Sequence, residues 1–202
     1  GVSRPGHALG ESEPGAGGPN AARLYESENS AAFAAVRDCP VPTIAAIGGI
    51  CFGGGFGMAA ACDIRIAAAD AVFSVPAAKL GLAYPVDAMA DIVHAIGPQV
   101  ARHMAYSAAR LDAAAALSAG FLLEVVEKDG LEARAAELAA VIAANAPLSI
   151  RASKASIRAV LTGDPADAAH ADALGDATFE SADYAEGRAA FREKRPARFS
   201  GR

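Results

Sequence analysis

Three consecutive glycines, Gly53, Gly54 and Gly55, are the residues of this sequence best suited to do chemistry, because they follow one apolar run and begin another. A strand that passes through a glycine turn into a helix leaves the backbone N–H groups of the first helical turn unpaired, and the helix dipole favours negative charge there. Glycine also lets an oxygen of a ligand approach the backbone closely. The stretch predicts a site for a phosphate or an oxyanion, and close packing of helix on strand is the alternative.

Three known glycine arrangements compete here. No lysine follows the glycines, so the stretch is not a GxxxxGK[ST] phosphate loop. It matches the dinucleotide pattern GxGxxG only loosely, and no acidic residue about 20 positions later ends a second parallel strand. The third arrangement is the oxyanion hole of enzymes that act on acyl thioesters, where backbone N–H groups stabilise charge on the thioester oxygen.

The cysteines do not indicate a metal site. Cys39, Cys51 and Cys62 lack zinc-binding spacings. Cys51 and Cys62 lie in apolar runs and are predicted to be small buried side chains. We expect no metal, and the cysteine usage fits a reduced, cytoplasmic setting.

Composition indicates a globular protein, since 53% of the 202 residues are hydrophobic and 20% are charged. The net charge of −5 argues against a broad nucleic-acid surface. The stretch from Cys39 to Cys62 carries no charge and is long enough to span a bilayer. Its glycines and prolines favour a buried strand, a turn and a buried helix instead, so we expect no membrane partner.

The elements that must position the glycines can be predicted from hydrophobic periodicity. A continuous buried strand is expected over residues 42–52, and a helix should begin after it. Before them, Leu24, Phe33 and Val36 have the spacing of an amphipathic helix. Further strands are expected at 63–68, 71–75 and 121–127, with helices at 86–97, 98–108, 113–120, 131–146 and 147–161.

Local signals refine this order. Asp112 can cap the helix that follows it, Gly97 can end the helix before it, and Pro147 suits a first helical turn. Strands alternate with helices first, and helices alone follow. The sequence therefore predicts an α/β core over residues 1–145 and a helical C-terminal region over residues 146–202.

The segment PTIAAIGGICFGGGFGMAAACDIRIAAADAVFSVPAAKLGL, residues 42–82, resembles the crotonase family, also called the enoyl-CoA hydratase/isomerase superfamily. The resemblance continues through LDAAAALSAGFLLEVV and NAPLSIRASKASI to SADYAEGRAAFREKRPARF. It implies a crotonase-type spiral of ββα units with a C-terminal helical region that forms oligomers. The first strands of that fold have no counterpart in the sequence and are expected to be absent from it.

The resemblance implies an acyl-CoA substrate whose thioester oxygen accepts hydrogen bonds from two backbone N–H groups. One donor would be Gly54, flanked by Gly53 and Gly55 in the substrate site. The other would be the N–H of Glu11 in HALGES. Coenzyme A would enter as part of the substrate, and no separate cofactor is expected.

The sequence departs from the family at the two glutamates that hydratases use to add water. Gly57 and Ala77 stand at those positions. Because general acid–base catalysis needs a titratable group within reach, ordinary hydration is not expected. We expect a lyase or isomerase that works through an enolate, as in decarboxylation; the rival interpretation is a non-catalytic acyl-CoA-binding or scaffold protein with the same fold.

Three side chains are candidates for the missing groups. Tyr84 stands where a decarboxylating relative has a tyrosine, and a half-buried loop aromatic is an equal alternative. Asp87 is a candidate general base, although the N-cap of the next helix is its favoured role. The Glu11 side chain is a third candidate, and a solvated loop carboxylate is favoured there.

Two C-terminal residues are candidates for CoA contact. Phe191 and Lys194, in AFREKR, match family positions that touch the CoA of a neighbouring subunit; a solvated basic helix end is the alternative. The helices of this region need a partner for their apolar faces, so we expect a homotrimer or a hexamer.

Overall fold

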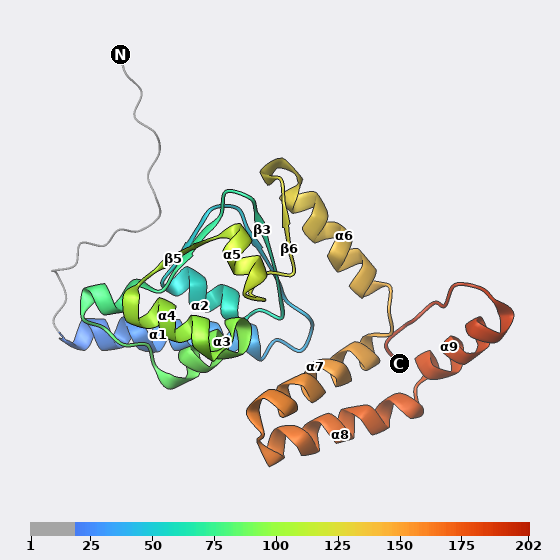
Figure 1. Cartoon of the computed structure of the whole chain (residues 1–202). Coiled ribbons are helices and arrows are strands. Elements are labelled where there is room, and N and C mark those ends of the chain that lie inside the picture. The colour runs from blue at the N-terminus through green and yellow to red at the C-terminus, as the bar shows by residue number, and fades with distance from the viewer. Residues whose placement is uncertain (1–18) are drawn as a thin grey trace.

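The computed structural model describes residues 19–202 (Figure 1). Helix α1 (Pro19–Arg37) precedes strands β1 (Ile44–Ile47) and β2 (Ile50–Phe52), and the glycine run leads into α2 (Gly54–Ala61). The chain then forms β3 (Ile64–Ala68), β4 (Val72–Ser74), the 3₁₀ helix η1 (Pro76–Leu80), α3 (Val86–Ile96), α4 (Pro98–Ser107), β5 (Arg110–Asp112), α5 (Ala113–Ser118), β6 (Glu124–Val126) and the 3₁₀ helix η2 (Lys128–Gly130). It ends with α6 (Leu131–Ala143), α7 (Pro147–Thr162), α8 (Pro165–Phe179) and α9 (Ala182–Glu193).

The strands form two small sheets, ordered β1-β3-β6 and β2-β4-β5. Strands β1 to β4 alternate between the two sheets: β1 pairs in parallel with β3, and β2 pairs in parallel with β4. Strand β5 then joins β4 in the second sheet, and β6 returns to the first. The chain therefore winds as a spiral of strand pairs. The predicted continuous strand over residues 42–52 is wrong, because Gly48 and Gly49 separate β1 from β2. Glycines in a strand allow the sharp bend that carries the backbone from one sheet to the other.

Three phenylalanines at the centre of the core hold the start of α2. The ring of Phe56 stacks on that of Phe121 with centroids 4.6 Å apart, and Phe73 meets both rings edge-on. All three side chains are fully buried, and aromatic pairs in these orientations add to the stabilisation from burial. Because Phe56 lies in the first turn of α2, the cluster fixes the helix end that carries the glycines.

The predicted helix signals are confirmed. Asp112 caps α5 by accepting a hydrogen bond from the Ala115 N–H at 2.8 Å. Gly97 ends α3 with a φ of 78°, and Pro147 lies in the first turn of α7. Strand β5, which ends at Asp112, was not predicted; its three residues form a strand by pairing antiparallel with β4.

The helix predicted from Leu24, Phe33 and Val36 is α1, but its buried face differs from the prediction. Phe33 is buried and Val36 packs beside it, whereas Leu24 is 61% exposed. Phe33 joins Ala61 of α2 and Ala88 of α3 in one buried cluster. Helix α1 therefore lies against α2, which follows the glycine turn, and against α3, which follows Tyr84.

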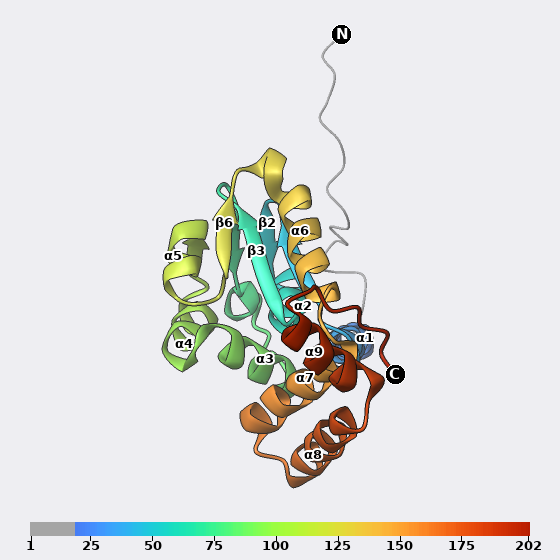
Figure 2. The same ribbon diagram turned by 90° about the vertical axis from the view of Figure 1, so that its right-hand side faces the viewer.

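The last helices extend from the α/β core. Helix α6 packs on the sheet that contains β1 and β3 (Figure 2). Leu131 of α6 is buried against Ile66 of β3. Helices α7, α8 and α9 lie beyond it, and α7 packs along α8 (Figure 1). The Lys154 Nζ donates to Asp63 Oδ2 at 2.8 Å and ties α7 to the core. The division at residue 145 stays a prediction. No helix of residues 19–202 is both long enough and apolar enough to cross a membrane.

Candidate active site

The glycine turn has the geometry that the sequence predicts. Gly53 precedes α2 with φ 58° and ψ −121°, in the positive-φ region that favours glycine. Its N–H donates to Ser74 O at 3.1 Å, and its carbonyl accepts from the Gly57 N–H at 3.0 Å. The N–H groups of Gly54 and Gly55 precede this first helical bond, so they have no acceptor within the helix. They can donate to a negatively charged oxygen.

Tyr84 approaches this turn from the loop before α3. A Cβ built on Gly53 would lie 3.7 Å from the Tyr84 hydroxyl oxygen. The ring is half-buried and packs against the cluster around Phe33. Burial, with smaller contributions from Tyr25 and Cys51, raises the pKa of Tyr84 to about 12. The hydroxyl therefore stays protonated at neutral pH and can act as a hydrogen-bond donor there.

Two residues of α1 approach the neighbouring glycine. A Cβ on Gly54 would lie 3.8 Å from Asn29 Oδ1 and 3.9 Å from the Tyr25 hydroxyl oxygen. Sequence reasoning missed both residues, because it considered only the apolar Leu24, Phe33 and Val36 of this helix. Their spacing carried the signal: Tyr25 and Asn29 precede the buried Phe33 by eight and four residues, and residues four apart share a helix face.

Phe33 also fills the space beside Gly57. A Cβ on Gly57 would lie 2.6 Å from Cζ and 2.8 Å from Cε2 of the Phe33 ring. Contacts this short do not occur between real carbon atoms, and Phe33 is only 4% exposed. With this ring in place, no side chain fits at position 57. Ala77 lies buried in η1.

Asp87 does not have its favoured role. Helix α3 begins at Val86 with Pro85 as its N-cap residue, so Asp87 lies inside the first turn. The prediction of Asp87 as N-cap is wrong, because Pro85 takes the extended backbone conformation that precedes the helix. The Asp87 carboxylate helps to raise the pKa of Asp91 one turn later; burial of Asp91 is the larger cause.

The remaining candidates lie away from the turn or outside the described residues. Glu11, including its backbone N–H, precedes residue 19 and lies outside them. Phe191 and Lys194 lie at the end of α9, where Phe191 is 86% exposed. The structure therefore brings Tyr84 to the glycines, and it leaves Phe191 and Lys194 on the distant helical region (Figure 1).

The cysteines behave as small apolar side chains. Cys51 is buried in β2, and burial raises the pKa of its thiol to about 12. Cys62 was predicted to be buried but is only half-buried, and its pKa is also raised, mainly by burial. Both stay protonated at neutral pH. Within residues 19–202, no cluster of histidine, cysteine and carboxylate side chains could hold a metal ion.

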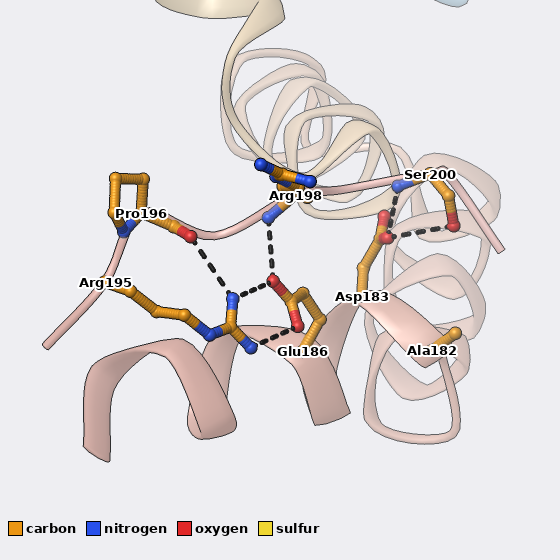
Figure 3. Close-up of a pocket in the computed structure, with 7 residues that line it drawn as sticks. All are labelled: Ala182, Asp183, Glu186, Arg195, Pro196, Arg198 and Ser200. Carbon is orange, nitrogen blue, oxygen red and sulfur yellow. Dashed lines mark hydrogen bonds and ion pairs between the residues drawn. The ribbon is translucent and has the colours of Figure 1, made fainter. Parts of the chain in front are cut away.

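A pocket of about 600 Å³ lies at α9, away from the glycine turn, between the helix and the C-terminal segment (Figure 3). Three of the four charged side chains that line it are engaged. Arg195 forms a two-point ion pair with Glu186 at 2.6 and 2.9 Å. Asp183 accepts from the backbone N–H groups of Ser200 and Gly201 at 2.6 and 2.9 Å. These bonds fasten the C-terminal segment to α9, so we interpret the pocket as part of a structural clamp.

Comparison with known proteins decides the family. The model of the enoyl-CoA hydratase/isomerase family matches residues 9–202. The chain belongs to the enoyl-CoA hydratase/isomerase family. The resemblance seen in the glycine-rich segment is thereby confirmed over nearly the whole sequence.

Individual family members show the same relationship. The chain is 34% identical over 171 residues to mouse (Mus musculus) mitochondrial methylglutaconyl-CoA hydratase, covering 82% of this chain and 54% of that protein. It is 32% identical over 180 residues to crotonyl-CoA hydratase of Syntrophomonas wolfei, covering 88% and 69%. The chain thus spans about half the length of the mouse relative.

A solved structure confirms the fold. The crystal structure of enoyl-CoA hydratase from Bacillus anthracis matches with a TM-score of 0.87 and 29% identity, covering 94% of this chain and 74% of that one. The predicted crotonase-type α/β fold is therefore correct for this member of the enoyl-CoA hydratase/isomerase family.

Proposed function

We propose that this chain binds an acyl-CoA thioester at the glycine turn, and that the Gly54 N–H donates to the thioester oxygen as an enolate forms. The observation that carries this proposal is the set of side chains at the turn. Among the described residues, the side-chain atoms within 4 Å of a Cβ on Gly53 or Gly54 are the hydroxyls of Tyr84 and Tyr25 and the amide oxygen of Asn29. None of these groups is a carboxylate.

The chemistry follows from this set. Hydration needs a titratable base and acid beside the substrate, and the Phe33 ring leaves no room for the first hydratase carboxylate at Gly57. Decarboxylation needs no base for its first step. The electron pair of the breaking C–C bond passes into the enolate, CO₂ leaves, and a proton adds to the α-carbon afterwards. The Gly54 N–H would stabilise the enolate oxygen, and the protonated Tyr84 would orient a polar group of the substrate.

A panel of acyl-CoA thioesters tests this proposal. Turnover and calorimetric binding are measured in parallel for crotonyl-CoA, a malonyl-type CoA and a β-keto acyl-CoA. We expect loss of CO₂ from the malonyl-type thioester and little hydration of crotonyl-CoA. Rapid hydration of crotonyl-CoA would refute the proposal.

The rival function is a non-catalytic acyl-CoA-binding protein. Gly57 and Ala77, which carry no acid or base, favour it. The same panel separates the two functions, because tight binding of all three thioesters without conversion of any would favour the rival.

The helical region supports a further part of the proposal, a homotrimer or hexamer. Apolar side chains stand exposed along α7, α8 and α9, including Val160 (84%), Phe179 (66%) and Phe191 (86%). A second copy of the chain would cover them, and Phe191 and Lys194 would then reach the CoA bound to the neighbouring copy. Light scattering coupled to size exclusion checks this; a monomer would contradict it.

A further inference from the structure

Helix α1 presents a regular row of side chains to the glycine turn. Tyr25, Asn29, Phe33 and Arg37 follow one another at intervals of four residues, and we call them the α1 stripe. Residues at this spacing lie one above another on a helix. Its two C-terminal members are fixed: Phe33 is buried, and the Arg37 Nε donates to Asp91 Oδ1 of α3 at 3.0 Å. Asn29 and Tyr25 precede Phe33 on the same helix face, where Asn29 is partly buried and Tyr25 is 65% exposed.

The fixed stripe brings two polar groups to Gly54. Asn29 Oδ1 and the Tyr25 hydroxyl oxygen would lie 3.8 and 3.9 Å from a Cβ on that glycine. An oxygen that accepts a hydrogen bond from the Gly54 N–H sits about 3 Å from the nitrogen. The carbonyl carbon of a thioester is one bond from that oxygen, and the α-carbon and the CoA sulfur are each two bonds from it. In the pose that we propose, the α-carbon faces Asn29 and Tyr25, and the sulfur leads away toward the rest of CoA.

A third polar group reaches the turn from the loop before α3. The Tyr84 hydroxyl lies beside Gly53, and the charge interaction between Tyr84 and Tyr25 contributes to the raised pKa of Tyr84. Two phenols and one amide thus lie at the turn. All three can donate a hydrogen bond without carrying charge, since the Asn29 amide presents either its oxygen or its N–H₂ group by rotation. Such groups match an oxygen acceptor and offer nothing to a plain hydrocarbon chain.

We propose that Asn29 and Tyr25, together with Tyr84, select acyl-CoA thioesters whose acyl group carries a second oxygen function, a carboxylate or a ketone, close to the α-carbon. This inference rests on the proposed function, because it takes Gly54 as the site of the thioester oxygen. Asn29 and Tyr25 are specificity-determining residues in this arrangement. A site that hydrogen-bonds a substrate group rejects analogues that lack the group, because its own polar atoms are then left unpaired.

Calorimetric binding tests the inference with ligands of similar size: butyryl-CoA, acetoacetyl-CoA and malonyl-CoA. The wild-type chain should bind at least one oxygen-bearing thioester about tenfold more tightly than butyryl-CoA, in line with about 1.4 kcal/mol for one hydrogen bond. Tyr25→Phe and Asn29→Leu should remove most of this preference by weakening the binding of the oxygen-bearing thioester, whereas butyryl-CoA should bind at least as tightly as it does to the wild type. Ser27→Ala, an exposed position between them on α1, is the matched control and should change nothing.

A charged variant distinguishes a carboxylate from a ketone as the oxygen function that the site recognises. Asn29→Asp should weaken the binding of malonyl-CoA, a carboxylate ligand, by tenfold or more through charge repulsion. It should weaken the binding of acetoacetyl-CoA, which carries a ketone, much less. Thermal unfolding verifies that each variant is folded, and Asn29→Ser replaces Asn29→Leu if the latter fails to fold.

The outcomes distinguish the two levels of proposal. Equal affinity of the wild type for butyryl-CoA and both oxygen-bearing thioesters would overturn the inference while leaving the acyl-CoA site intact. A loss of affinity for all three ligands alike in Tyr25→Phe and Asn29→Leu would also overturn the inference. If the wild type binds none of the three thioesters, the proposed function itself is wrong and the inference falls with it.

Discussion

The ring of Phe33 in α1 lies against the backbone of Gly57 in α2, so close that a Cβ on the glycine would be 2.6 Å from the ring. Position 57 therefore has no side chain because another helix occupies the space. The absence of a side chain at position 57, where we propose that hydratases carry a glutamate, and the approach of α1 to the glycine turn are two aspects of one packing arrangement. A glutamate placed at position 57 would displace Phe33 and, with it, the α1 stripe.

Gly57→Ala tests this packing. Alanine normally stabilises a helix by about 1 kcal/mol relative to glycine, but overpacking a core costs about 1–3 kcal/mol. We expect net destabilisation of up to about 2 kcal/mol in urea unfolding. Gly55→Ala, in the same helix with no atom within 4 Å of its Cβ, is the control and should be neutral or stabilising. Phe33→Leu should relieve part of the cost of Gly57→Ala in the double variant; additive costs would show that the two residues do not compete for space.

Tyr84→Phe tests the hydroxyl beside Gly53. It keeps the ring and removes only the donor, so turnover should fall about tenfold or more while CoA binding stays near normal. Because the pKa of Tyr84 is raised to about 12, the wild-type profile should show no loss attributable to this phenol between pH 7 and pH 10. Tyr106→Phe, an exposed tyrosine on α4, serves as control. Unchanged turnover in Tyr84→Phe would make the tyrosine structural.

The clamp at the C-terminal segment predicts a pH effect. Arg195 and the Arg198 backbone N–H lower the pKa of Glu186 from 4.5 to about 2 in the folded protein. A lowered pKa contributes stability above the unfolded value, and this stability is lost as the pH falls from about 4.5 through about 2. Glu186→Gln should therefore lose less stability than the wild type over that range. Urea unfolding at each pH measures this difference. An equal loss of stability in both proteins would show that Glu186 is not held by Arg195.

The Arg37–Asp91 ion pair between α1 and α3 predicts the opposite dependence of stability on pH. Asp91 is 8% exposed, and both Arg37 Nη2 and Asp91 Oδ2 are buried without a hydrogen-bond partner among the described residues. Burial raises the pKa of Asp91. The contribution of this carboxyl to the stability of the folded protein is therefore lost as the pH rises through its folded pKa. Asp91→Ala leaves Arg37 unpaired and should cost about 1–3 kcal/mol.

A double replacement is the test of that reasoning. Arg37→Met with Asp91→Leu removes both charges and fills their space, and it should recover most of the stability lost in Asp91→Ala. Greater loss in the double variant than in Asp91→Ala, measured by urea unfolding, would show that the pair itself stabilises the fold.

The sequence was informative where a local rule fixes the structure. The Gly53 turn and the Asp112 cap follow from backbone conformation and short-range hydrogen bonds, so neighbouring residues sufficed to predict them. The contacts of Tyr25 and Asn29 with the glycine turn are of another kind. They depend on how α1 docks on α2, which is set by Phe33 and by the Arg37–Asp91 pair across 54 residues of sequence.

The errors have related causes. The strand over residues 42–52 reads as continuous, because hydrophobic periodicity does not reveal that Gly48 and Gly49 turn the chain into a second sheet. Asp87 resembles an N-cap by residue type, yet Pro85 takes that position and the helix starts one residue earlier than Asp87. In both cases the deciding factor is the backbone path, which residue type alone does not specify.

The most direct test of the account compares Gly54→Pro with Gly54→Ala. Proline is tolerated in the first turn of a helix and removes the N–H, whereas alanine keeps the donor and places its Cβ no closer than 3.8 Å to Asn29. Turnover of the best thioester from the panel is measured for both variants. If the Gly54 N–H stabilises the developing oxyanion, the proline variant should turn over about 100- to 1,000-fold more slowly than the alanine variant. Equal turnover in two folded variants would contradict the central claim.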